Sequence, residues 1–333
     1  MRRHNAAVMR TGPTTWLAGS ALAALLWLLA PAAPAQVERP VKILVGFAAG
    51  GSADIAARLL AERMHGELRQ PVVVENKPGA AGRIAAESLK NAAPDGSTLM
   101  LAPIVVPVLA PLVFSRLGYD PVADFAPVAA VADFQFGLSV NAANPIRSVS
   151  ELITWSKFNA SLASYGTPAP GSLPHFFGVQ IAQATGVDYV HVPFNGGAPA
   201  MNALVGNQVG FVIDTVVDGI ELHRAGKTRM IATSGRRRSP LLPEVPTFAE
   251  AGLAGIEGVS WFAVYAPART PEATVLQINA AINKALANPE LRERFTRLGL
   301  EPTGGTPGEL AALMKRDGER WAPVVKASGF RAD

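Results

Sequence analysis

The sequence predicts an α/β fold made of two lobes, each with a mainly parallel sheet. Short runs rich in β-branched residues alternate with amphipathic helical stretches, which is the pattern of successive βαβ units. The 333 residues suffice for about two domains with separate cores. With 49% hydrophobic and 17% charged residues, the composition is that of a folded protein and excludes global disorder.

The first βα series extends from residue 41 to residue 102. Helical periodicity is visible in its first helix, where Leu60 and Met64, four residues apart, share one face. Five prolines between Pro103 and Pro127 then interrupt the pattern. In this series we expect strands at 41–45, 72–75 and 98–102, and helices at about 54–68 and 83–90.

The second βα series follows two extended stretches, 126–132 and 136–141. Its expected elements are helix 149–158, strand 162–165, helix 173–185, strand 189–193, helix 198–205 and strands 209–214 and 229–233. A last extended run, 261–266, precedes helices at 271–287, 289–298 and 307–328. Because these helices have no strand series of their own, we expect them to pack against the first lobe.

This order of elements predicts two doubly wound domains joined by crossing strands. Domain 1 would comprise residues 36–136 and 256–333, and domain 2 would comprise residues 137–255. Ligands of open α/β sheets bind at the carboxyl ends of the strands, and a cleft between domains is a common ligand site. A ligand cleft between the two domains is therefore expected.

Residues 1–35 have the three parts of an export signal. Three arginines and no acidic residue form a basic start, residues 16–30 are apolar, and Ala33-Pro34-Ala35 has small residues where a signal peptidase reads them. The alternative is a membrane anchor, but the apolar run is shorter than the roughly 20 residues that span a bilayer. We expect cleavage after Ala35 and a soluble periplasmic protein with no membrane anchor.

The formal net charge of +4 and the pI near 9.5 come largely from this signal. Without its three arginines the chain is nearly neutral, so the charge does not predict binding to nucleic acid. The run Arg236-Arg237-Arg238 is short and is typical of a solvated turn. The absence of cysteine excludes disulfides, thiolate chemistry and a lipoprotein anchor.

A junction of strand, glycine-rich turn and helix start occurs three times, within residues 44–52, 162–172 and 190–197. Glycines let backbone amides approach a ligand, and first-turn amides are free donors at the positive end of a helix dipole. Three such turns with uncharged linings predict an anion site made of amides and hydroxyls. Ser52 and Ser172 are alternatively simple helix N-caps.

Motifs that would predict a nucleotide, a metal or a hydrolase are missing. The chain has no P-loop, no G-x-G-x-x-G after a strand, no G-x-S-x-G elbow and no H-E-x-x-H. We therefore expect no cofactor and no metal. An exported hydrolase with Ser52 or Ser172 as nucleophile remains an alternative, and it would need a histidine base oriented by an acid.

Titratable residues lie next to these junctions. His175 follows a helix start and is either an anion contact or a packed group. Asp214 ends a strand, where a carboxylate faces the ligand crevice or caps the next helix. Asp54 lies just inside the first helix and suits its dipole, whereas His191 lies within an apolar strand and is expected to be structural.

Several short motifs in collinear order carry a family resemblance. They are VGFAAGGSAD at 45–54, PVVVENKPGA at 71–80, APDGSTL at 93–99, YDP at 119–121, DFAP at 124–127, HVPF at 191–194, APA at 198–200, RSP at 238–240 and PEVPT at 243–247. The sequence resembles the extracytoplasmic solute receptors of tripartite tricarboxylate transporters, also called the Bug family, over nearly all of residues 38–330. Asn195 stands where a lysine is frequent in that family.

The resemblance implies a type II periplasmic binding protein, not an enzyme, whose two domains close on a small carboxylate held by backbone amides and waters. It also implies a membrane permease of the tripartite type as partner, with a sensor kinase as the alternative recipient. We expect a monomer. The ligand-binding residues that it implies are Phe47, Ala48, Gly51, Ser52, Asp54, Thr167, Ser172, His175, Gly196, Ala198 and Asp214.

Overall fold

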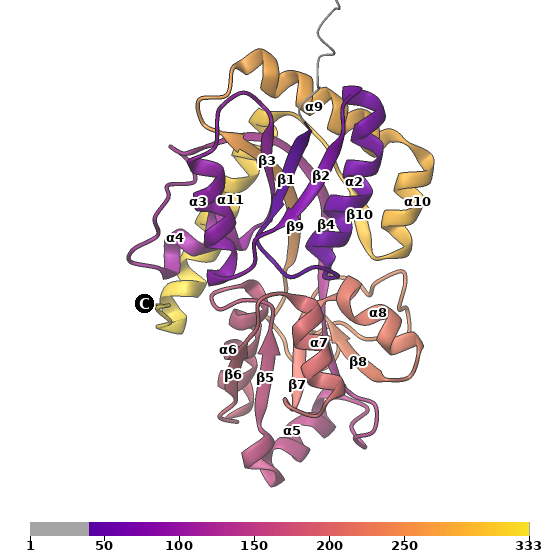
Figure 1. The fold of residues 1–333 in the computed structure, drawn as a ribbon. Helices are drawn as coiled ribbons and strands as arrows, with labels where there is room; N and C mark the ends of the chain where they lie inside the picture. The colour runs from indigo at the N-terminus through magenta and orange to yellow at the C-terminus, as the bar shows by residue number, and fades with distance from the viewer. Residues whose placement is uncertain (1–39, 333) are drawn as a thin grey trace, which may run out of the picture. The chain divides into compact units, whose positions relative to one another are not determined.

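The computed structural model describes residues 40–332, and the predicted export signal lies outside these residues. The described strands form a ten-stranded sheet in two halves (Figure 1). In the first half, called the first lobe below, the parallel strands β1, β2 and β3 are extended by antiparallel pairing of β9, β4 and β10. These strands are β2 (Val72–Asn76), β1 (Val41–Val45), β3 (Thr98–Pro103), β9 (Val259–Pro267), β4 (Phe125–Asn141) and β10 (Leu300–Pro302).

The second half of the sheet, the second lobe, shares strand β4 with the first. Here β4 pairs antiparallel with β7 and β8, and β7 continues into the parallel strands β5 and β6. The strands are β5 (Ser164–Thr167), β6 (Val190–Pro193), β7 (Phe211–Thr215) and β8 (Thr228–Thr233).

Strand β4 crosses from one lobe to the other without a break. Its residues 125–135 pair with β9, and its residues 136–140 pair with β7. The sequence predicted two separate extended stretches here, 126–132 and 136–141. In the structure the strand is continuous, so the lobes are connected by a shared set of backbone hydrogen bonds.

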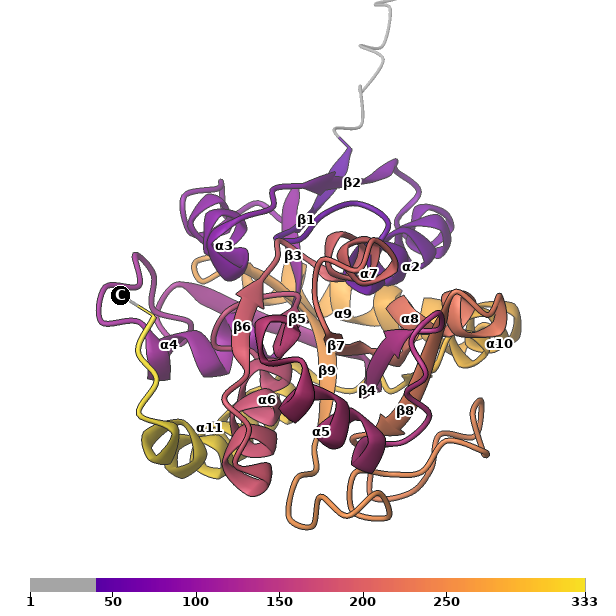
Figure 2. The ribbon, with the colours of Figure 1, turned by 90° about the horizontal axis from the view of Figure 1, so that it is seen from below.

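Helices cover both lobes, and Figure 2 views those of the second lobe from below. The helices are α2 (Ser52–Leu68), α3 (Arg83–Lys90), α4 (Ala110–Val113), α5 (Val149–Phe158), α6 (Leu173–Thr185), α7 (Gly197–Val205), α8 (Val216–Arg224), α9 (Glu272–Ala287), α10 (Pro289–Arg297) and α11 (Pro307–Ser328).

The carboxyl-terminal helices return to the first lobe. Helices α9 and α10 lie against α2, where Lys284 pairs with Glu67 at 2.7 Å and Arg294 with Glu62 at 2.9 Å. Helix α11 also reaches the second lobe, because the rings of Trp321 and Phe177 in α6 are 6.3 Å apart. The end of the chain therefore contacts both lobes.

The α/β prediction is confirmed, and most of the expected helices and strands lie within one to three residues of their observed bounds. Three elements were not predicted: α4, α8 and β10. Helix α8 is short and contains Gly219, which lowers its intrinsic helix propensity. Its beginning is instead stabilised locally, because the Thr215 hydroxyl accepts a hydrogen bond from the Asp218 amide at 3.1 Å.

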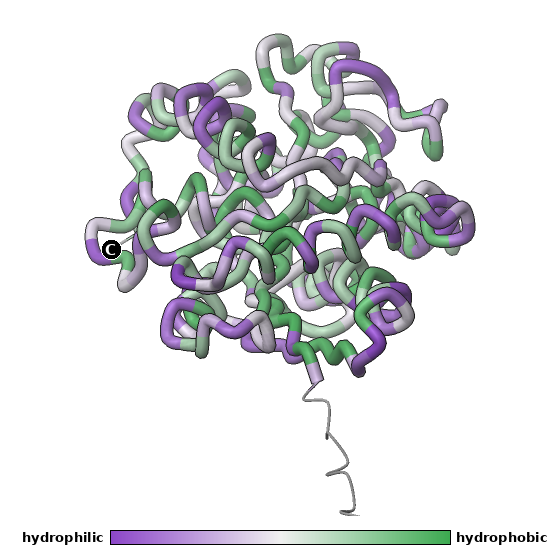
Figure 3. Tube along the Cα trace, turned by 90° about the horizontal axis from the view of Figure 1, so that it is seen from above, coloured by the Kyte–Doolittle hydropathy of each residue, from purple (hydrophilic) through white to green (hydrophobic). Residues whose placement is uncertain are grey.

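Hydrophobic segments concentrate on the strands and on the helix faces that cover them, and hydrophilic segments are mostly peripheral (Figure 3). One large cluster of buried side chains continues from the first lobe into the second through β4 and α6. Among residues 40–332, no helix is both long and apolar enough to cross a membrane.

Candidate ligand-binding cleft

Residues that follow β1, β5, β6 and β7 line one small cavity at the boundary between the lobes. The cavity encloses about 50 Å³, and the first turns of α2, α6, α7 and α8 contribute to its wall. First-turn amides lack partners within their own helix, so four helices place positive dipole ends at this space. The lining residues are Phe47, Gly51, Ser52, Ala53, Pro103, Ile104, Val105, Phe136, Pro168, Ala169, Ser172, Leu173, Pro174, Gly197, Asp214, Thr215, Asp218, Ser260 and Phe262.

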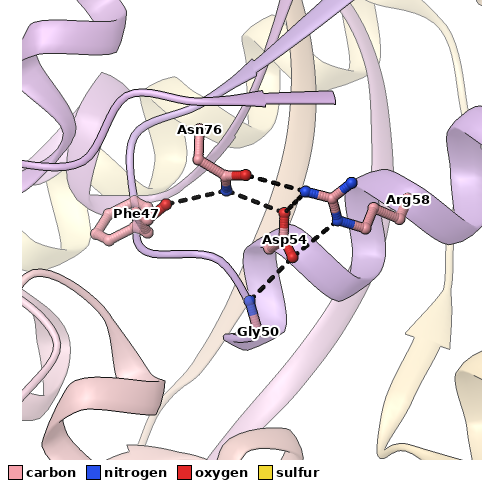
Figure 4. A network of polar contacts seen from close by, with 5 residues as sticks. All are labelled: Phe47, Gly50, Asp54, Arg58 and Asn76. Carbon is pink, nitrogen blue, oxygen red and sulfur yellow. Dashed lines mark hydrogen bonds and ion pairs between the residues drawn. The ribbon is translucent and has the colours of Figure 1, made fainter. Parts of the chain in front are cut away.

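The turn between β1 and α2 is held by the network around Asp54 (Figure 4). The Asp54 carboxylate accepts hydrogen bonds from the Gly50 amide at 3.0 Å, from Asn76 Nδ2 at 2.9 Å and from Arg58 Nε at 2.9 Å. Asn76 also donates to the Phe47 carbonyl at 3.1 Å. Burial raises the pKa of Asp54, but these hydrogen bonds outweigh it, and the pKa is lower than usual. The ionised Asp54 carboxylate therefore stabilises the conformation of this turn.

Asp218 connects the two lobes. Its Oδ1 accepts a hydrogen bond from the Ser52 amide at 2.7 Å, and its Oδ2 accepts one from the Ser52 hydroxyl at 2.9 Å. The Thr215 hydroxyl donates to the same Oδ2 at 2.7 Å. A second link joins the Ala48 amide to the Asn195 carbonyl at 2.9 Å. A carboxylate of the second lobe therefore occupies the N-terminus of a helix of the first lobe.

Asp214 lies beside Asp218 and is only 2% exposed. Its Oδ1 accepts a hydrogen bond from the Thr215 amide at 2.7 Å, whereas its Oδ2 is buried and has no hydrogen-bond partner within residues 40–332. Burial raises the pKa of Asp214 well above its usual value, and the neighbouring charge of Asp218 raises it further. Burial also raises the pKa of Asp218, against the opposing effect of its hydrogen bonds to Thr215 and Ser52. The pair therefore favours a shared proton over two negative charges.

The remainder of the wall is apolar. Phe47, Phe136 and Phe262 supply aromatic surface, and Ile104 and Leu173 supply aliphatic surface. Within the described chain, the lining contains no lysine, arginine or histidine. The cavity therefore has no cationic side chain, and any negative charge in it depends on amides, hydroxyls and helix dipoles.

The structure brings five of the eleven predicted residues into the cavity wall: Phe47, Gly51, Ser52, Ser172 and Asp214. The others lie around it. Ala48 and Asp54 hold the first turn, the Gly196 amide donates to the Pro168 carbonyl at 3.0 Å, and Ala198 is in the first turn of α7. Thr167 and His175 do not line the cavity and lie next to the second turn. Ligand contact by each of the eleven residues stays a prediction.

His175 and His191 stack on each other beneath that turn, with ring centroids 4.0 Å apart. His175 Nδ1 accepts a hydrogen bond from the Gly171 amide at 3.1 Å, and His191 Nε2 is 2.7 Å from the Thr167 hydroxyl. Burial lowers the pKa of His175 to about 4, and burial together with His175 lowers that of His191 to about 3. Both rings are therefore neutral at physiological pH, and they support the turn by packing.

This pair predicts loss of stability in acid. The histidines have an ordinary pKa of 6.5 once unfolded, so the unfolded chain binds protons more readily, and the free energy of unfolding falls as the pH drops below 6.5. At pH 4.5 His175 alone is expected to cost about 2 kcal/mol relative to pH 7. Urea unfolding at both pH values measures this difference. The difference in the free energy of unfolding between the two pH values should be smaller in His175→Phe. It should be unchanged in the control His65→Gln, a substitution on exposed helix surface. Equal differences in the wild type and both variants would contradict the prediction.

Sequence reasoning missed Asp218, Thr215 and Gly197, together with the aromatic residues of β4 and β9. The spacing Thr215-x-x-Asp218 was an available signal, because a threonine followed three residues later by an acid marks a helix start. Gly197 is in the third glycine-rich turn, one residue from the predicted Gly196. Nothing local indicated that Phe136 or Phe262 would face the cavity.

Two α/β lobes that share a crossing strand and enclose a cavity at strand ends and helix N-termini define a solute-binding receptor. A family model described as "Tripartite tricarboxylate transporter family receptor" matches residues 56–330. The chain belongs to this family, as the sequence resemblance indicated.

Individual proteins agree with this assignment. A UPF0065 protein in the gbd 5' region of Cupriavidus necator is 37% identical over 287 residues, which are 85% of this chain and 86% of that protein. The solved periplasmic binding protein BugD is 34% identical with a TM-score of 0.85, covering 88% of this chain and 99% of its own. R. palustris Rpa4515, solved with adipate, is 33% identical with a TM-score of 0.84. The match covers 88% of this chain and 98% of Rpa4515.

Proposed function

We propose that this protein is a periplasmic receptor that captures a small carboxylic acid between its lobes and delivers it to the membrane subunits of a tripartite tricarboxylate-type transporter. The observation that carries the proposal is the meeting of four helix N-termini, two of them without a side-chain cap, at one cavity with no cationic side chain in its described lining. Such termini bind anions through backbone amides. The similar protein solved with adipate supports a carboxylate as ligand.

Capture requires the lobes to open. A cavity of about 50 Å³ is small for a carboxylic acid and its body, so we expect the lobes to separate when the ligand enters. Opening breaks the hydrogen bonds from Ser52 to Asp218 and from Ala48 to Asn195. A ligand that contacts both lobes then favours the closed state by its differential affinity, and the permease distinguishes closed from open receptor.

We propose no catalytic role for Ser52 or Ser172. The Ser52 hydroxyl donates to Asp218, and the Ser172 hydroxyl donates to the Ala169 carbonyl at 2.7 Å. Within the described chain neither hydroxyl has a histidine as hydrogen-bond partner, whereas a serine nucleophile needs such a base. Export and cleavage after Ala35 would place residues 36–333 in the periplasm. We propose that the protein is a monomer there.

A thermal-shift screen of residues 36–333 tests the function. The panel contains mono-, di- and tricarboxylates, amino acids, sugars and phosphates, each at several concentrations. A ligand at 100 times its Kd adds about 2.7 kcal/mol to the free energy of unfolding, so the Tm of a binder rises with concentration. A rise with a carboxylate class supports the proposal. A rise with sugars or phosphates alone, confirmed by calorimetry, would reject it.

A further inference from the structure

The four helix N-termini at the cavity are not equally available to a ligand. Asp218 occupies the N-terminus of α2 with two hydrogen bonds to Ser52, and the Thr215 side chain caps α8. Helices α6 and α7 have no side-chain cap, and their first residues, Leu173 and Gly197, line the cavity. Among the four helix ends at the cavity within residues 40–332, these two are left for an incoming anion.

An unpartnered oxygen points to the same place. A Cβ built on Gly197 would lie 2.6 Å from Asp214 Oδ2, so this buried oxygen lies against the first turn of α7. Asp214 is 2% exposed, and its Oδ2 has no hydrogen-bond partner among the described residues. A proton carried on Asp214 Oδ2, rather than held between Asp214 and Asp218, would let this oxygen donate a hydrogen bond to a ligand carboxylate placed at α7.

A second carboxylate of the ligand would find no cationic side chain in the described lining. The described lining contains no cationic side chain, and its two carboxyl groups already share the space. An unpaired charge in such a site is strongly unfavourable, because burial removes its hydration without providing a partner. The remaining wall, with Phe47, Phe136 and Phe262, offers apolar contact instead.

We propose that the receptor is selective for monocarboxylates with an apolar body, and that Asp218 sets this selectivity by filling the second anion position of the cleft with a carboxylate of the protein itself. The inference rests on the proposed function and deepens it. In the closed complex the ligand carboxylate lies at the first turns of α6 and α7, its body lies against the aromatic wall, and Asp218 stays on Ser52.

Three six-carbon acids that differ only at their far end test the proposal: hexanoate, adipate and 6-aminohexanoate. Isothermal titration calorimetry of the wild-type protein is expected to give hexanoate a Kd at least tenfold lower than either other acid. In Asp218→Asn, which keeps the side-chain shape and removes the charge, adipate should bind at least tenfold more tightly, with hexanoate changed less than threefold. Glu221→Gln removes a charge from exposed surface of the same helix and should behave as wild type.

Every other outcome of the titrations rejects one part of the selectivity proposal. Adipate binding as tightly as hexanoate, or a hexanoate-to-adipate ratio unchanged in Asp218→Asn, rejects Asp218 as the determinant. Preference for 6-aminohexanoate shows that the acidic pair recruits a cation and rejects the apolar body. If Asp218→Asn lacks a cooperative melt, Asp218→Ser replaces it with the same expectation. Binding of other carboxylates only, with none of the three acids bound, rejects this inference and leaves the proposed function standing, whereas no carboxylate binding rejects both.

Discussion

Alanine in place of Gly197 is expected to weaken carboxylate binding about 100-fold, equivalent to about 2.7 kcal/mol. The added Cβ would lie 2.2 Å from Asp218 Oδ2 and 2.6 Å from Asp214 Oδ2, far inside van der Waals contact. The Asp218 carboxylate must therefore leave its position on Ser52, and the first turn of α7 loses the space beside Asp214. Folding should change little, because the atoms in collision are side-chain oxygens that can rotate away.

Calorimetry with the carboxylate that gives the largest thermal shift measures this effect. The matched control is Gly66→Ala in α2, where a built Cβ has no neighbour within 4 Å. The control should bind as wild type and be at least as stable, because alanine favours a helix over glycine. A Gly197→Ala protein with affinity within threefold of wild type would show that Asp218 and Gly197 do not shape the site.

Alanine at Gly46 is expected to lower the free energy of unfolding by about 3 kcal/mol. Gly46 follows β1 directly, and a Cβ there would lie 2.6 Å from the Gly82 Cα and 3.0 Å from the Gly82 carbonyl oxygen. These are backbone atoms, so the collision is not relieved by a rotamer change. Gly82 cannot easily move either, because it has a φ of +87° and packs against Val106 and Phe47 at the start of α3.

Urea unfolding at pH 7 tests this second substitution, with Gly66→Ala again as the control. The expected loss places the Gly46→Ala midpoint well below that of wild type with an unchanged m-value. Ligand binding should also weaken, since the first turn of the site begins at Gly46. A loss below 1 kcal/mol would mean that the contact between the two backbone segments yields at little cost.

The local part of the site was predictable, and the part made by distant contacts was not. Ser52, Ser172 and Asp214 were found because glycine-rich turns and strand ends leave a mark in the sequence near each residue. Asp218 was missed because its partner Ser52 is 166 positions away, and no local pattern connects a first-turn acid of one helix with the N-terminus of another. Similarly, nothing near His175 indicated that His191 would stack on it.

The elements of the fold likewise divide into those with a local sequence signal and those that depend on distant contacts. The sequence predicted α3, α5 and α11 to the residue, because α3 has a well-formed apolar face and α5 and α11 have clear caps in Ser148 and Thr306. Continuity of β4 past Asp133 was not predictable, since it depends on antiparallel pairing with β9 and β10, strands that come at least 118 residues later. Asp133 is accommodated there with its pKa raised to about 6 by burial and by the nearby Glu301 and Asp317.

The shared strand β4 has a consequence for how the protein unfolds. Residues 125–135 of β4 belong to the sheet of the first lobe and residues 136–140 to that of the second, so one continuous strand is part of both sheets. Loss of order in one lobe exposes unpaired strand edges and apolar surface in the other. We therefore expect the two lobes to unfold as one cooperative unit. We also expect the movement that admits a ligand to bend this continuous strand rather than to rotate the lobes about a loose linker.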